Sequence, residues 1–246
     1  MHYSFDYAQQ VHHPSNPMQP GPIYFKTPCK CGIFGVMCEA ILRQVNYLIN
    51  EATSVGKGVN STISMVHHYF THHGLGETRA HLHADNCSGQ NKNNFFLWYL
   101  TWQIMNELHQ HITYSFLSAG HTKFAPDRSF GIIEKVYKVN FISSIYKLAR
   151  VIEESSSVGV NKAQLVRTHD GRVIVPTCNW ASFVGRYFNK LSNIKKYHTF
   201  VLQGMNLVEF TTKRTALLLK SHSCCWKIHQ FIHHQLFFQQ QSLQKD

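Results

Sequence analysis

The feature that most constrains the fold of this chain is a short strand pattern that ends in an acid and runs into a helix. From Ala80 to Ala84, small or apolar residues alternate with His, which is typical of a strand with two different faces. Asp85 follows, then a polar turn, and residues 95–105 are apolar nearly all round, as in a buried helix. An acid at the carboxyl end of a core strand lies where open α/β sheets bind ligands, although Asp85 fits equally well as the cap of an ordinary strand–helix turn.

Similar patterns along the chain predict five strands and five helices. The strands are expected at residues 3–8, 23–26, 32–38, 80–84 and 112–117, and the helices at 60–70, 91–109, 129–138, 141–155 and 179–191. Three strands followed by strand–helix units indicate an α/β fold with a mixed sheet and flanking helices. This element order is that of the RNase H-like fold, a five-stranded mixed sheet with strand order 3-2-1-4-5.

In such a sheet the first and fourth strands are neighbours, so Asp6 and Asp85 would meet at its centre. Asp127 and Glu134 follow the fifth strand, and because they are seven residues apart they share one face of a helix. Convergent carboxylates favour hard cations such as Mg²⁺. Two such ions can activate the attacking oxygen and stabilise the leaving oxygen of a phosphodiester. The spacing therefore predicts an acidic metal site, with Asp127 and Glu134 as alternative third members.

The charge balance favours a polyanionic partner. The chain of 246 residues has a net charge of +11 with 18 His in addition, which points to nucleic acid unless the excess is confined to a solvated surface or a tail. We find no secretory signal and no apolar run long enough to span a bilayer. We therefore expect no membrane partner and an intracellular protein, in the nucleus or the cytosol.

Two other groups of residues invite a metal-site interpretation. Cys29, Cys31 and Cys38 lack the paired spacing of a zinc knuckle, so buried or free thiols are expected instead. His68 and His72 lie one helical turn apart but without the intervening Glu of a zinc-protease motif, so a solvated helix face is expected.

Four segments resemble an uncharacterised domain of eukaryotic transposon-derived proteins, and the resemblance covers roughly residues 1–200. The segments are FDYAQQ at 5–10, QPGPIYF at 19–25, DNCSGQNKN at 85–93 and GHTKFAPDRSFG at 120–131. That domain looks like an RNase H-like transposase core. By this resemblance Asp6, Asp85 and Asp127 are the catalytic, metal-holding acids, and Glu134 is a fourth or substitute member.

The resemblance implies metal-dependent DNA strand cleavage or transfer by a domain of mobile-element origin, with Mg²⁺ or Mn²⁺ as cofactor and DNA as partner in the nucleus. The alternative is a catalytically inactive or domesticated remnant that acts at most as a DNA-binding or interaction module. Whether the chain forms homo-oligomers stays open. The residues predicted to contact DNA are His121, Lys123, Arg128, Asn91 and Lys92. Structural roles in the loop and turn fit His121 and Asn91 equally well.

Composition divides the chain into an RNase H-like domain at residues 1–200 and a tail at 201–246. Family members usually carry a long region before this domain, so we expect the chain to be N-terminally truncated relative to them. The tail is basic and rich in Gln and His, and such tracts bury too little apolar surface to offset the entropy of ordering. We therefore expect it to be poorly ordered and to make few contacts with the core.

Overall fold

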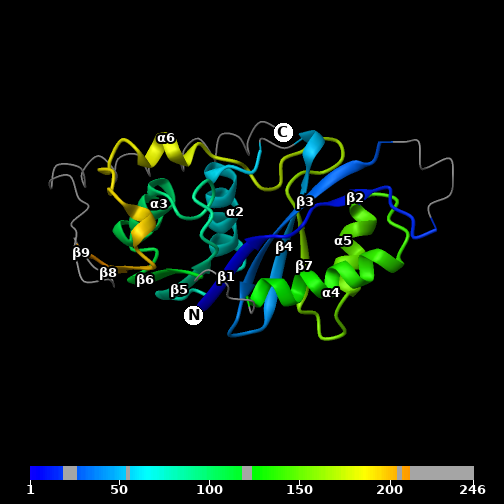
Figure 1. Cartoon of the computed structure of the whole chain (residues 1–246), viewed down its shortest axis with the longest axis horizontal. Helices are drawn as coiled ribbons and strands as arrows, with labels where there is room; N and C mark the ends of the chain where they lie inside the picture. Colours follow the sequence, from blue (N-terminus) through cyan, green and yellow to red (C-terminus); the bar gives the residue numbers. More distant parts are fainter. Residues whose placement is uncertain (19–26, 54–55, 118–123, 204–206, 211–246) are drawn as a thin grey trace, which may run out of the picture.

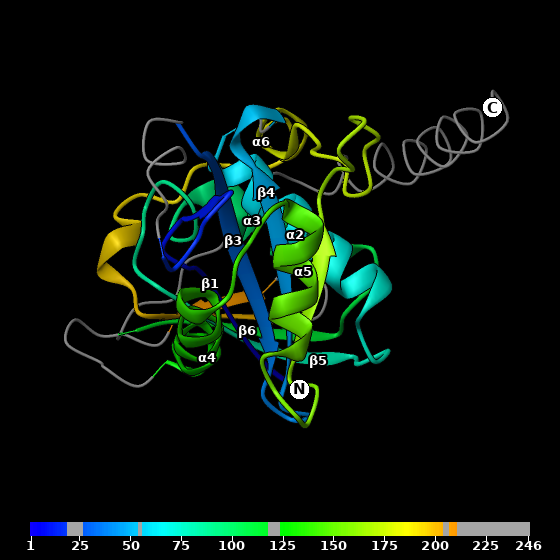
Figure 2. The same ribbon diagram turned by 90° about the vertical axis from the view of Figure 1, so that its right-hand side faces the viewer.

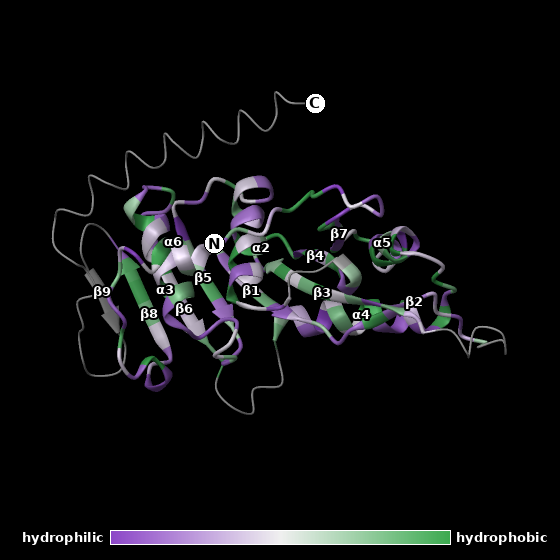
Figure 3. Cartoon of the chain, turned by 90° about the horizontal axis from the view of Figure 1, so that it is seen from above, coloured by the Kyte–Doolittle hydropathy of each residue, from purple (hydrophilic) through white to green (hydrophobic). Residues whose placement is uncertain are grey.

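The computed structural model describes residues 1–18, 27–53, 56–117, 124–203 and 207–210, which fold around one mixed β-sheet (Figure 1). Nine strands belong to the sheet within these residues. They are β1 (His2–Tyr7), β2 (Val11–His13), β3 (Cys29–Cys38), β4 (Arg43–Asn50), β5 (Arg79–Ala84), β6 (His111–Phe116), β7 (Asn161–Leu165), β8 (Thr199–Gln203) and β9 (Leu207–Phe210). Their spatial order is β7-β4-β3-β1-β5-β6-β8-β9, and β2 pairs with the start of β3 (Figure 3).

The strands at the centre of the sheet fix the directions of the rest. β1 runs parallel to β5, and β5 runs parallel to β6. β3 is antiparallel to both β1 and β4, while β8 is antiparallel to β6. The predicted mixed α/β fold is confirmed, and so is the prediction that the strand containing Asp6 and the strand before Asp85 are neighbours. A five-stranded sheet is not confirmed, because β2, β7, β8 and β9 extend it. The order 3-2-1-4-5 is not confirmed for the strands as predicted, because the one expected third, at 32–38, is β3 and pairs directly with β1.

Helices cover the sheet on both faces, and each group closes a hydrophobic core (Figure 2). The helices are α2 (Val59–His72), α3 (Asn94–Met105), α4 (Ala125–Val139), α5 (Ile145–Glu154) and α6 (Trp180–Val184), with short 3₁₀ turns η1 (Glu51–Thr53) and η2 (Ile194–Lys196). The larger core joins α2, α3 and α6 to the face that carries Phe5, Leu82 and Tyr114. The smaller core joins α4 and α5 to the opposite face of β3 and β4.

The apolar segment after Asp85 forms the helix that the sequence predicts, although α3 is shorter than residues 91–109. Its start is set by Asn93, whose side chain accepts a hydrogen bond from the Phe96 amide. The helix is buried on most sides, and Phe96 stacks on Phe5 with ring centroids 5.5 Å apart. Stacked aromatic rings therefore tie the helix after Asp85 to the strand that carries Asp6.

Several predicted boundaries differ from the structure. α4 begins at Ala125 and not at residue 129, because Pro126 is well tolerated in the first helical turn. The helix predicted at 141–155 begins at Ile145, and the one predicted at 179–191 is confined to α6. Strand β4 was not predicted. The strand predicted at 23–26 lies outside the described residues, as does most of the predicted tail.

The predicted domain boundary at residue 200 falls inside β8. This strand pairs with β6, and its Leu202 is buried in the larger core. β9 then pairs with β8 and carries the sheet as far as Phe210. The sheet thus continues into the first residues of the segment that was predicted to be a tail.

Candidate carboxylate site

Asp6 and Asp85 come together because of the register between β1 and β5. The last paired residues of these parallel strands are Phe5 and Ala84, so the two acids occupy the next position on each chain. Side chains alternate along a strand, which places both acids on the face opposite Phe5. They therefore lie side by side at the carboxyl ends of two central strands, where open α/β sheets bind ligands.

A glycine opposite Asp6 leaves room for the helix that carries the third acid. Gly35 of β3 is the register partner of Asp6. A methyl group there would approach the side chains of Gln44 and Phe130 to 2.7 Å, so no larger residue fits without movement. Phe130 belongs to α4, which allows this helix to pack beside the acidic end of β1.

The polar turn after β5 is held by its own side chains. Asp85 accepts hydrogen bonds from the Cys87 amide, at 3.1 Å, and from the side-chain amide of Asn91. Asn91 is fully buried, and its backbone carbonyl accepts a hydrogen bond of 3.0 Å from the Tyr114 hydroxyl. Its side-chain oxygen has no hydrogen-bond partner among the described residues. The orientation of the Asp85 carboxylate is thus set by the turn that follows it.

Lys92 is also buried, and burial lowers the pKa of its ammonium group. Its Nζ donates to the side-chain oxygen of Asn86 at 2.9 Å and lies 4.9 Å from the centre of the Phe116 ring. As placed, Asn91 and Lys92 organise the turn, and their contact with DNA stays a prediction. Arg128 is exposed on α4. The other two predicted DNA contacts, His121 and Lys123, lie outside the described residues.

The two candidate third acids differ in their surroundings. Asp127 lies in the first turn of α4 and is exposed, so its side chain is free to rotate. Glu134 lies two turns further on and forms an ion pair of 2.6 Å with Lys138. Both line a pocket of about 380 Å³ together with Tyr7, Gln10 and Tyr137. This pocket opens beside the strand end that carries Asp6.

The pKa of Asp6 shows that the acids interact. Burial raises it from 3.8 to about 7, and the charges of Asp85 and, more weakly, Asp127 act in the same direction. The Tyr7 amide donates to the Asp6 carboxylate at 2.7 Å and opposes this rise. Glu134 has no part in the shift. Asp85 and, more weakly, Asp127 therefore act on Asp6, and Glu134 is not among the causes of the shift.

The donor chemistry of this set fits a hard cation, because it offers carboxylate oxygens alone. Burial first and the charge of Asp85 second raise the pKa of Asp6, and a bound cation would favour its ionised form. The carboxylate oxygens of the three acids lie further apart than one bound ion requires. Among the described residues, the acids do not form a group whose oxygens all lie within 4.8 Å of one another. Asp6 and Asp85 follow the paired ends of neighbouring strands, and a cation held by them stays a prediction.

The other predicted metal candidates behave as ordinary side chains. Cys31 and Cys38 are buried free thiols, while Cys29 is exposed. The expectation of a solvated His face on α2 is wrong for His68. It also fails for His67, the residue before it. His67 packs edge-on against Trp180, and burial lowers its pKa to about 4. His68 is half-buried and hydrogen-bonds to the hydroxyl of Tyr47 at 3.1 Å. The hydrophobic core on this face extends to α6, which covers that side of α2.

One group of metal-ligand residues was not singled out in the sequence. His2, His81 and His83 offer ring nitrogens that all lie within 4.8 Å of one another. The signal was present as a His-x-His pair in the strand pattern before Asp85, but its third member comes from β1. Only the register of β1 against β5 brings His2 to this pair.

Fold and site together define a mixed α/β domain with acids gathered at the carboxyl edge of its central parallel strands. The chain belongs to a family described as a domain of unknown function, DUF7869, whose model matches residues 25–217. Asp85, Asp127 and Glu134 lie inside this match, and Asp6 precedes it. Comparisons with curated proteins and with solved structures gave no match. Among the described residues, no helix combines the length and apolar character needed to cross a bilayer.

Proposed function

We propose that this chain is an RNase H-like domain of transposon origin that cleaves or transfers DNA strands with Mg²⁺ or Mn²⁺ held at Asp6 and Asp85. The observation that carries the proposal is the pairing of these two acids at adjacent ends of central parallel strands. Two half-buried acids side by side repel each other unless one keeps a proton or a cation binds between them, and such perturbed acids cluster at functional sites.

The arrangement of the central strands supports the fold part of the proposal. The five strands β4-β3-β1-β5-β6 lie side by side. Counted along the chain, these five are β1, β3, β4, β5 and β6, so their order across the sheet is 3-2-1-4-5. β3 is antiparallel to its two neighbours, and β5 and β6 are parallel to β1. An RNase H-like core has this order, and the remaining strands are then additions at its edges.

Asp127 is the better third acid. Its charge raises the pKa of Asp6, whereas Glu134 does not contribute to this shift and forms an exposed ion pair with Lys138. When bound, the cations would activate the attacking oxygen and stabilise the leaving oxygen of the phosphodiester. The residues of the chain would hold the site: Asn91 and the Cys87 amide fix Asp85, and the Tyr7 amide fixes Asp6.

The net charge of +11 supports DNA as the partner, because a polyanion releases its counterions when basic residues approach it. A nuclear location follows from a DNA substrate. Assembly into homo-oligomers would be consistent with strand transfer, which joins two DNA ends.

The proposal is tested with the full chain and a labelled DNA duplex in Mg²⁺ or Mn²⁺. Wild type should nick or cleave the duplex, and Asp85→Asn should abolish this, whereas Glu134→Gln should retain most of it. Thermal melts give a second measurement. At ten times its Kd a cation that binds only the folded chain stabilises it by about 1.4 kcal/mol, or roughly 3–5 °C. An equal metal response in wild type and Asp85→Asn would refute the site.

A catalytically inactive remnant is the second candidate, and the wide spacing of the carboxylates favours it. A remnant would bind DNA without cutting it, and its melting temperature would not respond to Mg²⁺ or Mn²⁺. Filter binding of the same duplex at two salt concentrations separates the two candidates from a protein that does not bind DNA at all.

A further inference from the structure

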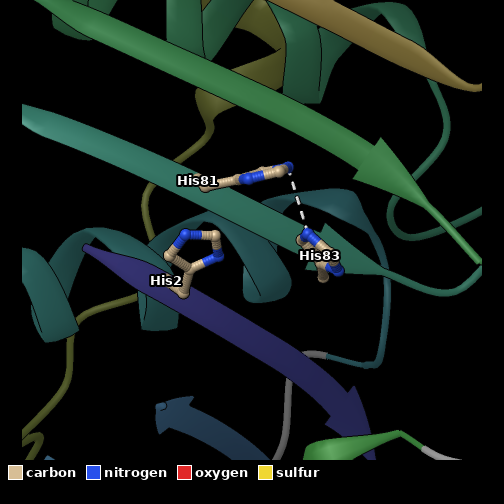
Figure 4. A group of neighbouring side chains, drawn as sticks. All are labelled: His2, His81 and His83. Atoms are coloured by element: carbon tan, nitrogen blue, oxygen red, sulfur yellow. Dashed lines mark hydrogen bonds between the residues drawn. The ribbon is translucent and has the colours of Figure 1, made fainter. Parts of the chain in front are cut away.

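A cluster of three His side chains lies on the same sheet face as the acids but further toward the start of β1 and β5. His2 and His81 are direct register partners across these parallel strands, and His83 follows His81 by two residues. All three side chains therefore project from one face, as Figure 4 shows, while Tyr3, Leu82 and Ala84 project into the larger core. The rigid pairing of two central strands sets their spacing.

The three imidazoles are close enough to share one ion. Their candidate ligand nitrogens lie within 4.8 Å of one another, and the Nε2 atoms of His81 and His83 are 3.0 Å apart (Figure 4). A tetrahedral zinc ion at about 2.05 Å from each nitrogen requires nitrogens roughly 3.3 Å apart. Small rotations of the side chains therefore suffice. His2 is exposed and the other two are half-buried, so an ion can enter from solvent.

The cluster also has an acid beside it. Each neutral imidazole has one lone pair that a metal ion can bind. Glu39 is the acid, since its charge acts on both His81 and His83, and it accepts a hydrogen bond from the hydroxyl of Ser4, the register partner of His83. A carboxylate near the three imidazoles offsets part of the charge of a divalent ion.

We propose that His2, His81 and His83 bind one Zn²⁺ ion, which joins the start of β1 to β5 at a site separate from the carboxylates. Three imidazole nitrogens form a ligand set that favours zinc over magnesium, and a water molecule or the nearby Ser115 hydroxyl, 3.0 Å from Nε2 of His81, completes the surroundings. The ion ties two strands that are 79 residues apart along the chain at His2 and His81.

The test is a titration of the full, metal-free chain with Zn²⁺ against a chromophoric chelator. Wild type should bind one equivalent tightly, and His81→Gln and His2→Gln should each weaken it by about tenfold or more. His72→Gln is the matched control, because His72 stacks on His68 at 4.1 Å between ring centroids and so belongs to another close His pair, on a helix. This variant should bind as wild type does.

Further measurements keep the outcome decisive. Circular dichroism of each variant without metal shows whether it folds, and His2→Gln is the safest substitution because His2 is exposed. Co²⁺ at the same site should give the intense visible absorption of a four-coordinate ion in wild type and lose it in His81→Gln. Asp85→Asn should bind Zn²⁺ as wild type does. Retained tight binding in both His variants, or its loss in His72→Gln or Asp85→Asn, would overturn the proposal.

Discussion

Replacing Asp85 with asparagine should lower the pKa of Asp6 in the metal-free protein and yet leave it above the ordinary value. Burial is the largest cause of the rise from 3.8 to about 7, and the charge of Asp85 is the next. The amide of the Asp85→Asn variant would keep a side-chain oxygen for the Cys87 amide and the Asn91 amide, so the turn should persist. The substitution therefore removes a charge with little change of shape.

The magnitude follows from the register. Neighbouring strands lie about 4.8 Å apart, which puts the two carboxylates roughly 6 Å apart on one face. At that distance two unit charges repel by about 0.7 kcal/mol in a fully aqueous dielectric and about 2.8 kcal/mol at a dielectric constant near 20, or roughly 0.5 to 2 pH units. Because burial contributes more than Asp85 does, we expect the pKa of Asp6 to fall by about one pH unit.

The assay is an NMR titration of the Asp6 carboxyl carbon in the presence of a chelator. Asp85→Asn should lower its pKa most, Asp127→Asn should lower it less, and Glu134→Gln, which changes an acid on the same pocket, should leave it unchanged. Equal effects of all three substitutions would show that the pKa reports net charge alone. An ordinary pKa of Asp6 in wild type would refute both the burial of this carboxyl group and its closeness to Asp85.

The same pKa makes a prediction about stability. Asp6 binds its proton more tightly in the folded chain than in the unfolded chain, so stability falls as pH rises from about 4 to about 7. A pKa shift of about three units corresponds to about 4 kcal/mol of unfolding free energy. Because the carboxyl group is partly exposed, solvent screening leaves roughly half of that. In urea unfolding, the free energy of unfolding of Asp85→Asn should therefore rise relative to that of wild type by about 1 kcal/mol as the pH increases from 5 to 8. A constant difference across this range would contradict the coupling.

Four further substitutions, one of them a control, probe the structure around the site. Gly35→Ala should destabilise the fold by about 1–3 kcal/mol in urea unfolding, because the added methyl meets packed side chains, whereas Gly131→Ala, which meets nothing within 4 Å, should be neutral or stabilising. Phe96→Ala should cost about 3–5 kcal/mol by the same measurement, because Phe96 is fully buried between α3 and β1. Asn91→Asp should place a second charge beside Asp85 and lower the melting temperature by several degrees more at pH 8 than at pH 4.

The acidic pair could be predicted from the sequence because both acids end strands whose patterns are local. Strand β4 could not be predicted in the same way. It buries Gln44 and Asn46, whose polar side chains are typical of a surface or a loop. In the structure Gln44 donates to Asn46 at 2.7 Å, and Asn46 donates to Asn161 of β7 at 3.2 Å. Buried amides become acceptable only when they are paired, and here the partner lies 115 residues further along the chain.

The third acid illustrates a different limit. The sequence places Asp127 and Glu134 on one helix face, and this is correct, since both line the same pocket. It does not show that Lys138 pairs with Glu134 or that Asp127 is close enough to act on Asp6. Those facts depend on how α4 docks beside Gly35, which is a tertiary contact. Local periodicity therefore predicted the candidates, and packing separated them.

The strand pair β1–β5 presents two donor sets on one face, and their chemistry keeps them distinct. Along this face β1 carries His2, Ser4 and Asp6, and β5 carries His81 and His83 and is followed by Asp85, in one continuous parallel register. Nitrogen ligands favour Zn²⁺ and carboxylates favour Mg²⁺ or Mn²⁺. Zn²⁺ should therefore bind at the start of the strand pair and Mg²⁺ or Mn²⁺ at its carboxyl end. Asp85→Asn should remove the thermal response to Mn²⁺ and keep the response to low Zn²⁺, and His81→Gln should do the reverse. A folded variant that loses both responses would contradict two separate sites on this strand pair, and with them the proposed Zn²⁺ site.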